Sequence, residues 1–254
     1  HLAESMLSKN TRNRKASRTS IDTYARDMKA GKWVMNGDAI RFDRNSNLLD
    51  GQHRLMACLK SGANFQSIVI YGLEPEVQDT IDGGRMRRTA DVMAINGIGS
   101  AHLRTATCRI LHAIKLDVPN VMAHKASTQE ILTINAKHPL LSRSIYTQKS
   151  NIGVRPATLA AVHYIGKNLL GDDPATADAF AAVFASGVPA YKGCPALLVR
   201  ERHIQGRLRG QPLSPTLGYG LIIHAWNHFR KHRAMKTMKV PADAKIEDLD
   251  IRKL

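Results

Sequence analysis

The chain has 254 residues, enough for one large domain or two small ones, and its 43% hydrophobic and 23% charged residues are ordinary for a globular protein. No apolar run approaches the roughly 20 residues that a membrane-spanning helix needs, and the start lacks an apolar core, so we expect neither a membrane span nor a secretory signal. The cysteines Cys58, Cys108 and Cys194 are far apart and odd in number, which argues against a disulfide framework or structural zinc site and favours a reducing cytoplasm.

The strongest bulk feature is the net charge of +16, which results from 37 Lys and Arg residues and only 21 Asp and Glu residues. Such an excess attracts polyanions, so we expect nucleic acid, DNA in particular, as the main partner. A basic surface that serves solubility or another acidic partner is the alternative. The candidate nucleic-acid contacts are Arg12, Arg14, Lys15, Arg87, Arg88, Arg207 and Arg209.

The N-terminal third is predicted to mix helices and strands. Residues 1–16 form a basic arm that could touch phosphates. A helix is expected from Ser20 to the stop signal at Gly31. Alternation over 39–43 and the short run 48–49, separated by a polar turn, predict a hairpin. The run 68–71 is the clearest strand in the sequence.

A cluster of polar residues follows the hairpin. Asp50, Gly51, Gln52, His53 and Arg54 stand between the strand and the first turn of a helix, where unpaired N–H groups favour anions. Arg54 is suited to clamp a phosphate, Asp50 to bind Mg²⁺, and His53 to shuttle a proton near neutral pH. We predict the active or ligand-binding centre here. The absence of a P-loop motif and of His-Glu-x-x-His argues against those two classes of site.

A second polar cluster spans residues 80–89. Gly83 and Gly84 free the backbone for close approach to a ligand, and Arg85 supplies a phosphate clamp. Asp82 is a second candidate ligand for Mg²⁺. The alternative is a solvated basic turn before the next helix.

From residue 101 onward the pattern becomes helical. Helices are expected over 101–116, 127–137, 155–170, 174–186, 195–209 and 214–231. The predicted organisation is therefore an arm (1–16), an α+β domain (17–97), an all-helical domain (98–235) and a charged tail (236–254).

Residues 17–95 resemble the N-terminal domain of the ParB/sulfiredoxin superfamily. The run Leu48-Leu49-Asp50-Gly51-Gln52-His53-Arg54-Leu55-Met56-Ala57 is similar to that family's D-G-x-x-R-x-x-A box, and Asp82-Gly83-Gly84-Arg85 is similar to a degenerate second box. The resemblance implies a small mixed-sheet α+β fold. It also implies that Gly51, Gln52, His53 and Arg54 contact nucleotide phosphates, and that residues of the second box complete the pocket. Sulfinic-acid reduction is not expected, because Gln52 stands where that reaction needs a cysteine.

The resulting expectation is a ParB-like, DNA-associated protein of phage or mobile-element type, which binds a CTP- or ATP-class nucleotide with Mg²⁺. Two alternatives stay open. One is an enzyme on the same fold, a nuclease or nucleotide-dependent phosphotransferase, with Asp50 and His53 in the chemistry. The other is a non-catalytic phage or host regulatory module. We expect a cytoplasmic location, nucleoid-associated or in phage-infected bacteria, and a homodimer stays open.

Overall fold

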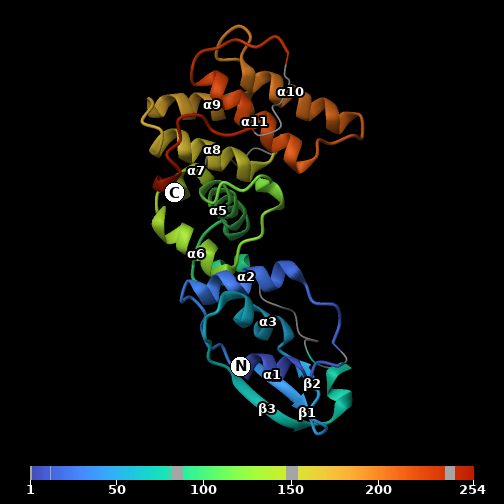
Figure 1. Cartoon of the computed structure of the whole chain (residues 1–254). Helices are drawn as coiled ribbons and strands as arrows, with labels where there is room; N and C mark the ends of the chain where they lie inside the picture. Colours follow the sequence, from blue (N-terminus) through green and yellow to red (C-terminus); the bar gives the residue numbers. More distant parts are fainter. Residues whose placement is uncertain (1, 12, 80, 82–87, 147–153, 238–243) are drawn as a thin grey trace. The chain divides into compact units, whose positions relative to one another are not determined.

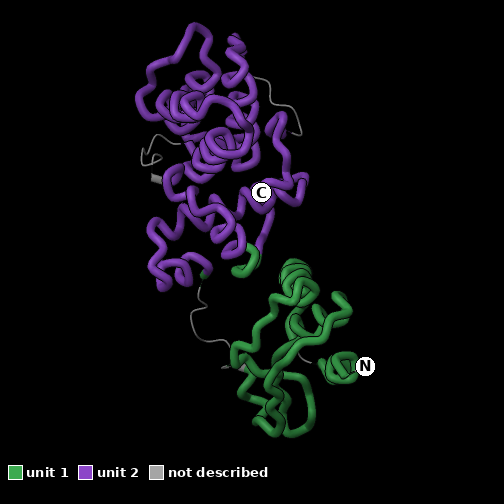
Figure 2. The backbone as a smooth tube through the Cα atoms, turned by 90° about the vertical axis from the view of Figure 1, so that its left-hand side faces the viewer, with its two compact units in different colours: residues 1–88, 127–130 green, residues 89–126, 131–254 purple. Residues whose placement is uncertain are grey.

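The computed structural model describes residues 2–11, 13–79, 81, 88–146, 154–237 and 244–254 (Figure 1). The chain forms two compact units, which are shown in different colours in Figure 2. Unit 1 contains His1–Arg88 and Ser127–Glu130, and unit 2 contains Thr89–Ala126 and Ile131–Leu254. Within the described residues no helix is sufficiently long and apolar to span a bilayer.

Unit 1 is a mixed α+β unit, as predicted. Its elements are α1 (Leu2–Leu7), α2 (Arg18–Lys29), β1 (Ala39–Asp43), β2 (Leu48–Asp50), α3 (Gln52–Ser61), β3 (Ile68–Leu73) and the 3-10 helix η1 (Pro75–Asp79). The strand order is β2-β1-β3, with β1 antiparallel to β2 and parallel to β3. The predicted hairpin is confirmed, and α3 is the crossover that a parallel neighbour requires.

The core of unit 1 is small. Ile40, Phe42 and Leu48 of the hairpin are almost fully buried, and they form one cluster with Met6 of α1 and Leu55 of α3. The helix α2 begins at Arg18, earlier than predicted, because Ser17 is its N-cap and accepts a hydrogen bond from the Ser20 N–H. The sheet, α3 and the start of α2 therefore converge on the polar run that follows β2.

Unit 2 is all helical in its described residues, as predicted. Its helices are α4 (Thr89–Ile95), α5 (Ala101–Lys115), α6 (Thr128–Lys137, shared with unit 1), α7 (Leu141–Tyr146), α8 (Pro156–Asn168), α9 (Pro174–Ser186), α10 (Pro195–Leu208), α11 (Pro215–Phe229) and the 3-10 helices η2 (Val121–Ala123) and η3 (Ile251–Lys253). Four of them begin at a proline, a residue whose fixed φ and missing N–H suit the first helical turn.

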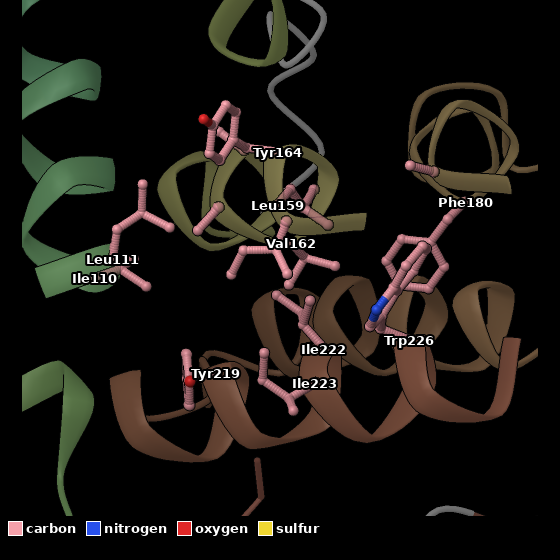
Figure 3. Packing of buried hydrophobic residues seen from close by; sticks show 14 of the residues in the cluster. Ile110, Leu111, Leu159, Val162, Tyr164, Phe180, Tyr219, Ile222, Ile223 and Trp226 are labelled. Atoms are coloured by element: carbon pink, nitrogen blue, oxygen red, sulfur yellow. The ribbon is translucent and has the colours of Figure 1, made fainter. Parts of the chain in front are cut away.

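The core of unit 2 is one continuous apolar cluster (Figure 3). Trp226 of α11 is fully buried and packs edge-on against Phe180 of α9 at 5.2 Å between ring centroids. It also lies against α8 at Gly166, where an added Cβ would come within 2.5 Å of the indole. The three helices thus approach closely because α8 has no side chain at this position.

Two features differ from the expectation. The short helices α1 and α7 were not predicted. The helix α4 belongs to unit 2, because Ala90 and Met93 join its core, so the units divide before the boundary predicted at residue 97. In the predicted charged tail, Leu254 and Ile246 join the buried core of unit 2.

Candidate functional site

The predicted site lies where β2 passes into α3. Gly51 is the N-cap of α3 and has φ +104°, in the region that L side chains rarely adopt. A Cβ on this residue would lie 3.0 Å from Cγ1 of Ile40 on the neighbouring strand. The glycine is therefore required both by the turn and by the close approach of β1.

Asp50 is the electrostatic centre of the turn. Its Oδ2 accepts hydrogen bonds from Arg41 Nη1 at 2.7 Å and Arg54 Nη2 at 3.0 Å, and its Oδ1 accepts one from the Gly51 N–H at 2.6 Å. Arg41 lies directly opposite Asp50 in the β1–β2 register. Two guanidinium groups thus share one carboxylate, which leaves an excess positive charge beside the N-terminus of α3.

Arg54 has a structural task. Besides Asp50, its guanidinium donates to the carbonyl oxygens of Asp38 at 2.7 Å and Ala39 at 2.8 Å, and its side chain is only 11% exposed. It therefore fixes the start of β1 to the start of α3. The phosphate contact predicted for Arg54 stays a prediction, and the same group would have to perform both tasks.

Gln52 is turned toward the N-terminal arm. It is 5% exposed, its Nε2 donates to the carbonyl of Arg14 at 3.0 Å, and its Oε1 accepts from Asn10 Nδ2 at 3.3 Å. Asn13 adds a bond of 2.7 Å to the carbonyl of Leu48 on β2. These contacts hold the arm against the hairpin.

His53 fixes the end of the arm. Its Nε2 accepts a hydrogen bond from the N–H of Ser17 at 2.9 Å. Burial lowers the pKa of His53 and the positive charge of Arg14 lowers it further, while Asp50 partly opposes both effects. The neutral imidazole that accepts this bond is therefore the favoured form. The catalytic roles of Asp50 and His53 stay predictions.

The arm carries exposed cations over the predicted stretch. Arg14 and Lys15 are exposed, and so is Arg18 in the first turn of α2. Arg12 lies outside the described residues. Arg207 and Arg209, also predicted to contact nucleic acid, are exposed at the C-terminal end of α10 in unit 2.

The second predicted box cannot be placed against the first. Asp82, Gly83, Gly84, Arg85 and Arg87 lie outside the described residues, and Arg88 is exposed. Within the described part of the chain, no group of three or more His, Cys, Asp or Glu side chains could hold a metal ion. The Mg²⁺ site predicted at Asp50 and Asp82 depends on both boxes and stays a prediction.

Sequence reasoning missed the partners of the box. Arg41, Asn10, Asn13 and Ser17 complete the hydrogen-bond network around residues 50–54. Arg41 could have been found by counting the hairpin register, since it pairs with Asp50. The asparagines carry no such signal, because their partners are 35 or more residues away.

Comparison of the chain with protein-family models, with curated proteins and with solved structures gave no significant match.

Proposed function

We propose that this protein binds DNA through the N-terminal arm, and that the Asp50–Arg54 box orders the arm for that purpose. The observation that carries the proposal is the set of bonds from Gln52 and His53 to the backbone of Arg14 and Ser17. They fix the main chain on both sides of Lys15 while the cationic side chains stay exposed. A pre-ordered arm loses less conformational entropy on binding than a free one.

The charge of the chain supports the same function. A net charge of +16 favours a polyanionic partner, and exposed Arg and Lys side chains supply phosphate contacts that are independent of base sequence. Arg18 lies in the first turn of α2, where a helix N-terminus also favours phosphate. The proposal is the ParB-like, DNA-associated function expected from the sequence, assigned to particular residues.

The test is a salt titration of binding to a short DNA duplex, followed by fluorescence anisotropy. Replacing Arg14, Lys15 and Arg18 by alanine should reduce the slope of log K against log salt by roughly 2 to 3, because each lost phosphate contact contributes about 0.9. A charge-matched control replaces the exposed residues Lys29, Lys137 and Arg143. Equal slopes for the two triple variants would sink the proposal.

A second variant separates the effect of ordering the arm on DNA binding from the effect of the arm's charge. Gln52→Met removes both hydrogen bonds to the arm, keeps the buried volume and leaves the net charge unchanged. We expect weaker DNA binding with little change in the salt slope, because the phosphate contacts remain but the arm must be ordered on binding. Unchanged affinity at all salt concentrations would show that the box does not prepare the arm.

A nucleotide at the same turn is the second candidate. Among the described residues, no hydrogen bond uses the backbone N–H groups of Gln52, His53 and Arg54 at the start of α3. Together with the excess positive charge around Asp50, these donors suit a phosphate group. Calorimetry with CTP, ATP and ADP in the presence of Mg²⁺ tests this, and absence of saturable binding by all three would reject it.

A further inference from the structure

Unit 2 contains a cavity that the proposed function does not use. Its volume is about 310 Å³, at the small end of the range for ligand pockets. The wall is formed by the N-terminal end of α8, by α10 and by the segment that leads into α11, all within unit 2. The residues that matter below are Arg155, His203, Arg207, Pro212, Leu213 and Gly218.

His203 is a buried polar group without a partner. The residue is 5% exposed, its ring forms part of the cavity wall, and its Nδ1 makes no hydrogen bond. A buried polar atom that is left unpaired costs about 1–3 kcal/mol. Because Nδ1 itself is enclosed by protein atoms, a ligand in the cavity would meet the Nε2 edge of the ring. Gly218 of α11 lies against this edge of the ring, where a Cβ would be 3.4 Å from Nε2.

The charges around His203 all have one sign. Arg155 and Arg207 line the cavity with it, and Arg202 is the third charge that acts on it. Burial is the largest cause that lowers the pKa of His203, and the three arginines lower it further, with no carboxylate opposing them. Among the described residues, no acidic side chain lines the cavity. Two cationic side chains, Arg155 and Arg207, thus line the cavity beside the buried imidazole.

The start of α8 adds backbone donors to the same wall. Arg155 is the N-cap of this 13-residue helix, and no side chain caps it. Pro156 has no N–H, and the N–H of Ala157 has no hydrogen-bond partner among the described residues. The helix dipole therefore presents its positive end beside the arginines.

From these observations we infer that the cavity binds a phosphomonoester. The phosphate would be held by Arg155, Arg207 and His203 at the N-terminus of α8, and its organic part would pack against Pro212 and Leu213. Two guanidinium groups and a neutral imidazole suit a phosphate dianion. A cavity of this volume holds one small phosphorylated group rather than a continuous strand. The inference is independent of the DNA contacts proposed for unit 1.

Calorimetry on the full chain at constant ionic strength tests the site with inorganic phosphate and adenosine 5′-monophosphate, against chloride as the background anion. We expect saturable binding, tighter for the monophosphate. Arg207→Gln should weaken it about ten- to a hundredfold, the effect of losing a charge-assisted hydrogen bond. Arg209→Gln is the matched control, since Arg209 is exposed at the end of the same helix but does not line the cavity.

The source of the phosphate is distinguished with two short DNA strands, one with a 5′-phosphate and one with a 5′-hydroxyl. Preference for the phosphorylated strand, lost in Arg207→Gln, would show that the cavity takes a nucleic-acid end. Binding of the mononucleotide without that preference would show a small-molecule site. The triple variant of Arg14, Lys15 and Arg18 should leave mononucleotide binding unchanged, which separates this site from the arm.

His203→Phe provides an independent check, because it keeps an aromatic ring while removing the ring nitrogens. Circular dichroism establishes that each variant is folded before binding is measured. No saturable binding of either phosphate probe at millimolar concentration, or equal losses in Arg207→Gln and Arg209→Gln, would overturn the inference.

Discussion

Replacing Gly51 by alanine should destabilise unit 1 strongly, for two separable reasons. The residue has φ +104°, and a left-handed backbone costs a non-glycine residue about 1–2 kcal/mol. The new methyl group would also lie 3.0 and 3.2 Å from the two γ carbons of Ile40 and 3.4 Å from its Cα. Because Ile40 is buried in β1 and the Cα cannot rotate away, overpacking adds about 1–3 kcal/mol. The expected loss is about 2–5 kcal/mol in the free energy of unfolding.

Gly62 at the other end of α3 provides the matched control. It has φ +67°, but nothing lies within 4 Å of an added Cβ, so Gly62→Ala should cost only the backbone part, about 1–2 kcal/mol. Urea unfolding followed by tryptophan fluorescence measures both variants. The chain has two tryptophans, so a Trp226→Phe background leaves Trp33 of unit 1 as the reporter. If Gly51→Ala loses no more stability than Gly62→Ala, the steric reasoning is refuted.

Further predictions concern the turn at Asp50, the core of unit 2 and the pH dependence of the stability of unit 1. Asp50→Asn should cost about 1–3 kcal/mol in urea unfolding, because it weakens the bonds that hold the nearly buried Arg54; an unchanged midpoint would contradict this. Gly166→Ala should destabilise unit 2 by at least about 1–3 kcal/mol in thermal unfolding, because its Cβ meets Trp226. The folded-state pKa of His53 lies below its ordinary value of 6.5, so protons bind the unfolded chain first as pH falls. Unit 1 should therefore lose stability as the pH falls through about 6.5, the ordinary pKa of histidine, and His53→Gln should reduce that loss.

The order of elements in unit 1 was predictable because local signals agree with the tertiary structure there. The alternating run 39–43 forms the predicted strand, although four of its five residues are buried rather than every second one. The short run after the polar turn completes the hairpin. Gly51 and Gly62 mark both ends of α3, each with a positive φ that favours glycine. The position of the polar cluster at the start of a helix followed directly from these signals.

Other parts were set by contacts that no local pattern reports. The helix α1 has six residues, too short to be stable alone, and depends on packing Met6 into the core of unit 1. The helix α4 follows the glycine-rich cluster in sequence, yet Met93 makes it part of unit 2. The cavity in unit 2 combines residues from 154 to 218, and Arg207 is the one residue of its described wall that the sequence predicted to be functional, as a nucleic-acid contact.

A dense cluster of polar residues in a sequence does not by itself indicate a ligand site, as residues 50–54 show. Asp50, Gln52 and Arg54 have the chemistry to bind phosphate or metal, but in the structure each bonds to the protein itself. Loss of ligand binding in Arg54→Ala would therefore be ambiguous, because the substitution also releases the start of β1. Gln52→Met and the exposed cations of the arm are the sharper probes. Gln52→Met tests whether the box holds the arm in place, and the substitutions of the exposed cations test whether the arm contacts a partner.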